Sequence, residues 1–482
     1  MVQRSSFGEN TVSPPRLRQP RKYARVAIEK SEVKDAEAVK VDAGLGLGRS
    51  FRCSWAPDGT LIHFGKVCAP TTSLYVFEIS AKERRNNHAF SSPSTESTIF
   101  IEKIDLLSEE PKIESRKASR LLNLHMENTQ IDTLDSVPYA GISSEIRFSD
   151  FCQLFENGDR SHEASVWRLG QALFDEIDLR LPMDASDDLV VRISELRRKL
   201  ALSKWLEQAV SSSVDQDLLK NDTQPSKIFT LLSGHQNERA VETALSGNDM
   251  RLSTLLSQIG GPETFKEEVY RQLEDWKKYK VNPYISTGYR KLYALLAGIT
   301  DISPGDPDGK GVEKCSDVLI AEDLDWKRCF GLEMWYKNSF DQTIGQAFES
   351  YTTALDSRPP PAEPLPPYLE KPSSTVKPWK TPKQPTDILY NMIKMFSDIT
   401  VPLDDVLRSK DCSPSPMDMR MCWHLYILLS RVLGKRDFRD RDEEGYSASA
   451  DSITVGYAVQ LEDGGDWRLA AFVLLHLETS DG

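Results

Sequence analysis

The sequence predicts a mostly α-helical protein, an irregular solenoid of short helices preceded by a short segment of β-strands. Two observations carry this prediction. From about Phe148 to the end of the chain, apolar residues recur every three or four positions, which is the spacing of one buried helix face. Between Gly44 and Leu107, β-branched and aromatic residues instead gather in short or alternating runs typical of strands. This order differs from that of an α/β enzyme, in which strands and helices alternate.

Composition and charge limit the partners of the chain. Its 482 residues are 39% hydrophobic and 28% charged, a balance typical of folded, soluble proteins. The longest apolar run, Leu469 to Leu477, is far shorter than the roughly 20 residues that cross a bilayer. The net charge of −13 disfavours nucleic acid as the main partner, because that affinity depends on cations that neutralise phosphates.

Residues 1–43 are expected to form a disordered basic tail. From Met1 to Lys30 the chain has seven Lys or Arg against two acids, in a stretch rich in Ser and Pro. A targeting or nucleic-acid role is the alternative interpretation.

Residues 44–107 are predicted to form strands. Arg49 to Trp55 and Thr60 to Phe64 flank Ala56-Pro57-Asp58-Gly59, which has the residue order of a type I turn, so they are expected to form a hairpin. Ser73 to Ile79 and Thr98 to Leu106 are further β-prone runs. Three or four short strands have only marginal stability in water by themselves. The segment must therefore pack either on the helices that follow or on the sheet of a partner. The residues alone leave both possibilities open.

Helical periodicity organises the remainder of the chain. Buried faces are predicted for five sets of residues: Ile193, Leu196, Leu200, Trp205, Leu206, Ala209 and Val210; Phe265, Val269, Leu273 and Trp276; Ile388, Met392 and Phe396; Met421, Leu425, Leu428, Leu429 and Val432; Trp467, Ala471, Leu474 and Leu475. Glycines follow several of the apolar helical ends and are expected to adopt the left-handed backbone conformation that ends many helices: Gly234, Gly247, Gly260, Gly298 and Gly434. No strand is predicted between these helices and no repeat has a fixed period, which indicates an irregular solenoid. Residues 357–385 hold ten prolines and are expected to be an extended crossing between two helical stacks.

The sequence contains no residue pattern typical of catalysis, cofactor binding or metal binding. The run from Gly44 to Gly48 lacks the glycine spacing of a dinucleotide site and the Lys-Ser/Thr of a phosphate-binding loop. The seven cysteines include no C-x-x-C pair, and the seven histidines show no metal-ligand spacing. His424 is expected to be a satisfied core histidine, and the tryptophans of the helical region are expected to pack in the core: Trp167, Trp205, Trp276, Trp326, Trp335, Trp423 and Trp467. We therefore predict no enzymatic activity, no small-molecule substrate and no cofactor.

Several short motifs occur in an order found in one known family. They are Gly48-Arg49-Ser50-Phe51-Arg52 with Trp55 and Pro57; Glu195-Leu196-Arg197-Arg198 with Ser203, Trp205 and Leu206; Leu324-Asp325-Trp326-Lys327-Arg328; Pro364-Leu365-Pro366 with Tyr368-Leu369-Glu370; Pro416-Met417-Asp418 with Arg420; Trp423-His424-Leu425; and Phe472-Val473-Leu474-Leu475-His476. From about Gly44 to its end, the chain resembles the scaffold nucleoporin ninety-six family, known in fungi as the C-terminal product of nucleoporin one hundred and forty-five.

The resemblance implies a subunit of the Y-shaped outer-ring complex of the nuclear pore, at the nuclear envelope, supporting nucleocytoplasmic transport and mRNA export. The implied fold is the ancestral coatomer element, a folded-back helical solenoid with a trunk and a crown. The chain would start in the trunk (108–223), form the crown (224–356), pass through the proline-rich crossing (357–385) and return along the trunk (386–482). A vesicle-coat scaffold of the same architecture is the alternative.

The resemblance also implies the partners. In this family the N-terminal strands insert as an extra blade into the open β-propeller of Sec-thirteen, which decides between the two possibilities for residues 44–107. The residues expected to bind the propeller are Leu47, Gly48, Arg49, Ser50, Phe51, Trp55, Leu61, Phe64, Leu74, Val76, Phe77, Ile79, Ile99 and Ile101. Neighbouring helical nucleoporins would bind the crown and trunk. The family's upstream His-Phe-Ser autoproteolysis site is absent from this sequence, so we expect the chain to begin after processing or to be a shortened piece. The family's helical tail toward the hub of the Y is also absent, which leaves assembly at the hub open.

Overall fold

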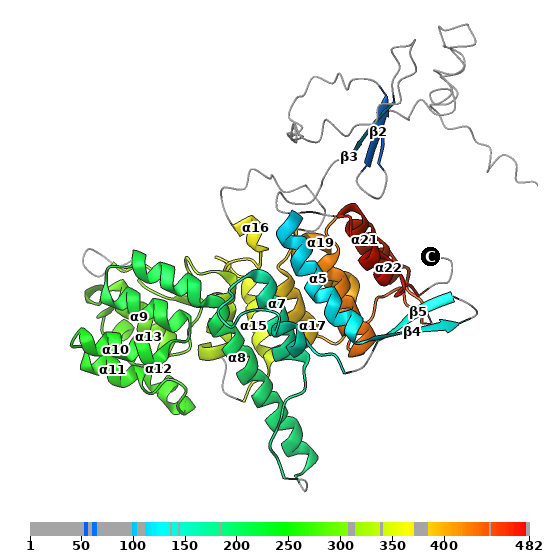
Figure 1. The fold of residues 1–482 in the computed structure, drawn as a ribbon. Helices are drawn as coiled ribbons and strands as arrows, with labels where there is room; N and C mark the ends of the chain where they lie inside the picture. Colours follow the sequence, from blue (N-terminus) through cyan, green and yellow to red (C-terminus); the bar gives the residue numbers. More distant parts are fainter. Residues whose placement is uncertain are drawn as a thin grey trace, which may run out of the picture. The chain divides into compact units, whose positions relative to one another are not determined.

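The structure is a computed structural model that describes the strands 53–55, 60–64 and 99–103 and the body 111–478. Within that body, residues 135–136, 143–144, 183–184, 307–313, 338–340, 371–383, 414, 416 and 443–444 are not described. The chain divides into two compact units, Met1–Glu109 and Glu110–Gly482, which are considered separately. The described residues are mostly helical, as predicted (Figure 1).

The first unit contains a three-stranded antiparallel sheet of β1 (Cys53–Trp55), β2 (Thr60–Phe64) and β3 (Ile99–Lys103), with β2 in the middle. The predicted hairpin is confirmed, because Trp55 pairs with Leu61 and Cys53 pairs with His63. β2 has the predicted bounds, and β3 lies within the predicted run from Thr98 to Leu106. The predicted turn Ala56 to Gly59 and the predicted strand Ser73 to Ile79 lie outside the described residues.

The second unit begins with a helix and a hairpin and then becomes helical. Its first part contains α5 (Pro111–Glu127), β4 (Thr129–Leu134), β5 (Val137–Ile142), α6 (Phe148–Cys152), α7 (His162–Phe174) and α8 (Asp187–Lys220). Its middle part contains α9 (Gln224–Ser233), α10 (Asn237–Ser246), α11 (Met250–Leu256), α12 (Glu263–Lys278), the 3₁₀ turn η2 (Asn282–Tyr284), α13 (Thr287–Leu296), β6 (Ile302–Ser303), β7 (Val318–Leu319), α14 (Trp326–Leu332), the π-helix η4 (Glu333–Lys337) and α15 (Ile344–Leu355). Its last part contains α16 (Pro367–Glu370), α17 (Ile388–Ser397), α18 (Leu403–Val406), α19 (Ser409–Cys412), α20 (Arg420–Tyr426), the π-helix η5 (Ile427–Val432), α21 (Ala448–Asp463) and α22 (Trp467–Leu474).

Helix starts follow local side-chain chemistry. Asp325 caps α14 by accepting a hydrogen bond from the backbone N–H of Arg328, and Thr343 and Gln346 form a reciprocal capping box at α15. In the proline-rich crossing, the described residues 357–366 are not helical and α16 is four residues long, which agrees with the prediction for that part.

Two predictions about the helical region are wrong in part. Strands do interrupt the helices, as the hairpins β4–β5 and β6–β7. Three of the five glycines have the expected left-handed backbone, Gly260, Gly298 and Gly434. At the ends of α9 and α10 the left-handed residue is instead the one after the glycine, His235 (φ 57°) and Asn248 (φ 61°).

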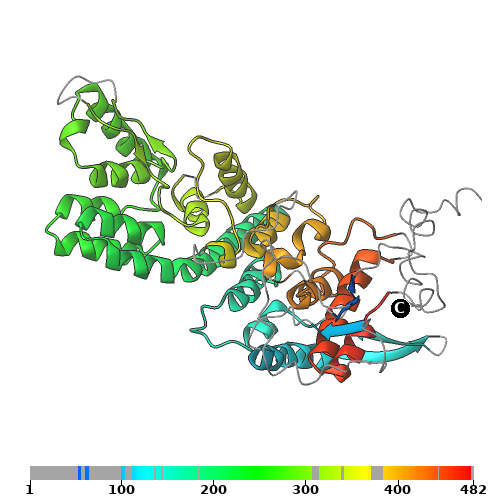
Figure 2. The ribbon, with the colours of Figure 1, turned by 90° about the horizontal axis from the view of Figure 1, so that it is seen from above.

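The second unit folds back on itself, so that its first and last helices share one core. In both ribbon views α5 lies beside α21 and α22 (Figures 1 and 2), and the backbone N–H of Ala140 in β5 donates to the carbonyl of Leu475 after α22 at 2.8 Å. The middle helices α9 to α13 lie at the opposite end of this unit (Figure 2). No helix among the described residues is both long and apolar enough to cross a membrane.

The predicted core residues are mostly confirmed. Four of the tryptophans are buried: Trp167, Trp205, Trp326 and Trp423. The predicted buried face of α22 is wrong: Trp467 and Leu474 are 65% and 41% exposed and Ala471 is also exposed, because the helix buries Ala470, Phe472 and Val473 instead. Leu200, placed on the buried face of α8, is 49% exposed.

Candidate functional site

The predicted propeller-binding residues are only partly described. Trp55 lies in β1, Leu61 and Phe64 lie in β2, and Ile99 and Ile101 lie in β3. The sheet brings them together through its register, in which Phe64 pairs with Ile99. Among the described strands, β1 and β3 each pair with β2 alone. The other predicted residues lie outside the described part of the chain: Leu47, Gly48, Arg49, Ser50, Phe51, Leu74, Val76, Phe77 and Ile79.

A buried carboxylate joins the outgoing and returning helices of the second unit. Asp387, at the start of α17, is fully buried and accepts a hydrogen bond from the indole N–H of Trp326 at 3.2 Å. Its other oxygen lies 2.9 Å from Nε2 of His162 in α7 and accepts from the backbone N–H of Leu389. One side chain therefore connects three helices that are far apart in the sequence.

A second connection is an ion pair between α7 and α20. The guanidinium of Arg420 donates to both carboxylate oxygens of Glu163, at 2.6 and 3.2 Å, and the two side chains are only 15% and 13% exposed. Such a bidentate pair fixes orientation as well as distance. It holds the first helices against the last ones.

Three histidines form a buried cluster where α5, α20 and the end of α22 meet. The His125 ring stacks on that of His424 with centroids 5.0 Å apart, and Trp423 contacts both His125 and His476 edge-on at 5.2 Å. Burial, reinforced by the neighbouring His476, lowers the pKa of His125 to about 3, and burial lowers the pKa of His476 to about 4. His424 is a core histidine as predicted, but the prediction that it is satisfied is wrong for Nδ1, which has no hydrogen-bond partner in the protein.

The middle helices carry a set of exposed apolar side chains. The set lies on α10, α11, α12 and the 279–284 turn, with exposed fractions from 44% to 75%: Leu245, Met250, Tyr270, Tyr279 and Tyr284. Tyrosines exposed in this way are enriched in protein interfaces. Sequence reasoning named no individual contact here, because the three-and-four spacing does not report which aromatic residues remain uncovered.

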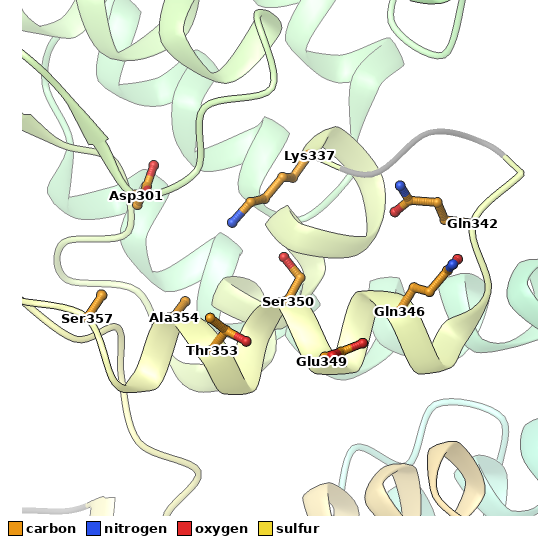
Figure 3. Close-up of a pocket in the computed structure, with 9 residues that line it drawn as sticks. All are labelled: Asp301, Lys337, Gln342, Gln346, Glu349, Ser350, Thr353, Ala354 and Ser357. Atoms are coloured by element: carbon orange, nitrogen blue, oxygen red, sulfur yellow. The ribbon is translucent and has the colours of Figure 1, made fainter.

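A polar pocket of about 480 Å³ lies beside α15 (Figure 3). α15 lines one side of it, and Lys337 of η4 points into it between Asp301 and Ser350 (Figure 3). Two lining residues, Ser350 and Lys337, contact the buried Glu333, which accepts hydrogen bonds from Thr300 and Ser350, both at 2.5 Å, and pairs with Lys337 at 3.0 Å. These contacts saturate the carboxylate and join three segments, so the arrangement serves packing. Within the described residues, no group of three or more His, Cys, Asp or Glu side chains is placed to hold a metal ion.

Comparison with known proteins identifies the family. Residues 226–482, more than half of the chain, match the family model described as nuclear protein 96. The chain belongs to the nuclear protein 96 family. This confirms the predicted family, the description of the chain as a nucleoporin and its location at the nuclear pore.

Relatives from distant organisms agree with this membership. The chain is 30% identical to nucleoporin nup189 of Schizosaccharomyces pombe over 66% of its own length and 17% of that protein. It is 27% identical to nuclear pore complex protein NUP96 of Arabidopsis thaliana, over 91% of the chain and 42% of the relative. For nuclear pore complex protein Nup98-Nup96 of Dictyostelium discoideum the identity is 25%, over 98% of the chain and 21% of the relative. The chain thus spans less than half the length of these nuclear protein 96 relatives.

Proposed function

We propose that this chain is a structural scaffold subunit of the outer-ring, Y-shaped complex of the nuclear pore and supports transport and mRNA export through it. The match of more than half of the chain to the nuclear protein 96 family carries this proposal. Its fold would be the ancestral coatomer element, with a trunk formed by residues 108–223 and 386–482, a crown formed by 224–356 and the crossing at 357–385. The pairing of Glu163 with Arg420 across the fold supports a trunk made of outgoing and returning helices.

Residues 44–107 would bind the Sec-thirteen β-propeller as an inserted blade. The three described strands form a small sheet that is marginal in water without a covering layer, which supports pairing with a partner sheet. If about six apolar strand residues are buried at roughly 1.5 to 3 kcal/mol each, the gross gain is on the order of 10 kcal/mol before ordering costs. Such a gain supports a stoichiometric subunit rather than a transient contact.

Co-expression with the Sec-thirteen propeller tests the blade. We would measure the mass of the complex by size-exclusion chromatography with light scattering, for the full chain and for a chain without residues 44–107. A one-to-one complex that forms only with the segment is expected. Trp55→Asp combined with Leu61→Asp should weaken it, and Leu219→Asp, at a position 87% exposed in α8, is the matched control. A full chain that stays monomeric beside the propeller would refute the blade.

The crown would bind a neighbouring helical nucleoporin through its exposed apolar side chains. Tyr279 and Tyr284 are 67% and 75% exposed, so replacing both by Glu should not disturb the core. We expect the double variant to lose the complex with one helical subunit of the Y-shaped complex from the same organism, measured by light scattering after co-expression. Tyr139→Glu, at a position 42% exposed on β5, is the control. An unchanged complex in the double variant would place the contact elsewhere.

A further inference from the structure

A groove with an apolar floor and a basic rim lies along α8, apart from the exposed side chains assigned to the crown contact. Its volume is about 600 Å³, and its walls come from α8, from the 259–266 segment and from η4. Every residue from Asp187 to Leu200 is exposed or half-buried, and the first buried residue of the helix is Leu202. In Figure 1 this N-terminal half of α8 extends away from the helices around it. The helix therefore begins well outside the core that holds its C-terminal half.

The apolar residues of this half form a regular stripe. Leu189, Ile193, Leu196 and Leu200 are spaced four, three and four residues apart, which is the repeat of a helix that packs against another helix. Leu189 and Leu200 are 43% and 49% exposed, and the last three residues of the stripe line the groove. The stripe spans about 16 Å, or three helical turns. A surface of this kind is complementary to an amphipathic helix of similar length.

The groove is held open by rigid contacts. The indole N–H of Trp335 donates to the hydroxyl of Ser203 at 2.9 Å, and the ring of His235 stacks on Trp335 with centroids 4.8 Å apart. On the opposite wall, the backbone of the 259–266 segment turns at Gly260, where φ is +81°. A preformed groove lowers the ordering cost of binding.

Charge narrows the choice of partner. The lining includes the cations Arg197, Lys199 and Lys266 but the single carboxylate Glu263, which lies 3.7 Å from Lys266, so the lining has an excess of positive charge. Burial lowers the pKa of Lys199, the neighbouring charge of Lys266 lowers it further, and the nearby Asp341 offsets part of this shift. The chain as a whole has a net charge of −13, so the positively charged lining of the groove differs in sign from the rest of the chain.

We propose that this groove binds an amphipathic helical segment of another protein, with leucine-like residues at three-and-four spacing flanked by Asp or Glu. None of the chain's own longer undescribed segments carries an excess of acids. Residues 1–52 carry eleven Lys or Arg against six acids, residues 65–98 carry four against three, and residues 371–383 carry four Lys and no acid. Acidic flanks would be attracted by the rim and would steer the encounter.

A labelled peptide tests the proposal with the full chain. The probe is a fluorescein-labelled helix of about 15 residues with leucines at three-and-four spacing and Glu at the flanking positions. Its binding is measured by fluorescence anisotropy, and the same peptide with Lys in place of Glu is the comparison. We expect the acidic peptide to bind, the basic one not to bind, and added salt to weaken binding.

Two variants in α8 locate the site. Leu200→Asp should reduce affinity about tenfold or more, whereas Leu219→Asp on the same helix should leave it unchanged. Arg197→Glu should also weaken binding, and Lys435→Glu, an exposed lysine outside the lining, should not. Tyr279→Glu, a crown variant, should leave peptide binding intact, so the outcome is independent of the crown contact.

Three results would overturn the proposal. They are no binding of the acidic peptide, equal binding of both peptides, or equal effects of Leu200→Asp and Leu219→Asp. A dimer of the chain, seen by light scattering and lost in Leu200→Asp, would assign the groove to a second copy instead.

Discussion

Mild acid is expected to destabilise the second unit through its buried histidines. His125 and His476 are neutral in the folded protein, where burial lowers their pKa values from 6.5 to about 3 and about 4. In the unfolded chain they take up protons below pH 6.5. Their contribution to stability is therefore complete above pH 6.5 and is lost as the pH falls from 6.5 toward the folded-state values.

The size of the effect follows from these pKa values. One pH unit below 6.5 corresponds to about 1.4 kcal/mol per histidine, so each of the two lowers the free energy of unfolding by about 2 kcal/mol at pH 5.0. His424, whose pKa is also lowered by burial and by the neighbouring His125 and Arg420, acts in the same direction. The loss is a large share of the 5–15 kcal/mol that is typical of folded domains.

The substitution His125→Phe isolates one histidine. Neither ring nitrogen of His125 has a hydrogen-bond partner in the protein, so an aromatic ring without polar atoms should fold equally well or better at pH 7.5. Urea unfolding followed by tryptophan fluorescence, at pH 7.5 and 5.0, measures the free energy of unfolding. The variant's advantage over the unmodified chain should grow by about 2 kcal/mol between these pH values.

A second buried substitution is the control. Tyr351, whose pKa burial raises, does not titrate between pH 5.0 and 7.5, so Tyr351→Phe should change stability by the same amount at both pH values. If the advantage of His125→Phe were equal at pH 7.5 and 5.0, the histidine would not be taking up its proton on unfolding and the reasoning would be refuted.

Three further predictions concern packing and are measured by the same urea unfolding at pH 7.5. Glu163→Ala should cost about 3–5 kcal/mol, because it leaves the Arg420 guanidinium buried without its partner, and a smaller cost would mean that solvent reaches Arg420. Gly170→Ala should destabilise by more than about 1 kcal/mol, because the added Cβ would lie 2.1 Å from the Phe148 ring; no change would contradict this packing. Gly298→Ala should cost about 1 kcal/mol because φ is +82° there, whereas Ala at Gly158, which has open space and no positive φ, should cost less; equal effects would argue against backbone strain.

Much of the local structure could be predicted from the sequence because its causes are local. The turn residues between Trp55 and Thr60 predicted the hairpin β1–β2, whereas its register, with Trp55 opposite Leu61, comes from the structure. Three-and-four spacing predicted α12, α17 and α20 with the correct type of element. The hairpin β4–β5, which lies between two helices, was not predicted. Its two strands are short and one contains Pro138, so the alternation typical of strands is weak there.

The candidate surfaces were less predictable, because exposure depends on what covers a residue. The helix of Trp467 is apolar on most sides, so periodicity could not choose which side faces the core. Leu200 fits the repeat of a buried face, yet it lines an open groove and is 49% exposed. The sequence-based interpretation therefore treated four exposed side chains as core residues: Leu200, Trp467, Ala471 and Leu474.

By itself, the sequence determined that the described chain is mostly helical, that strands precede the helices and that the chain belongs to the nuclear protein 96 family, since composition, periodicity and ordered motifs are properties of neighbouring residues. Only the tertiary structure decided that Glu163 meets Arg420 and that His162 meets Asp387, across 257 and 225 residues. It also decided which stripe of α8 remains open and which three histidines share one core. Such contacts join residues far apart in the sequence and depend on how the whole chain folds, which local patterns do not specify.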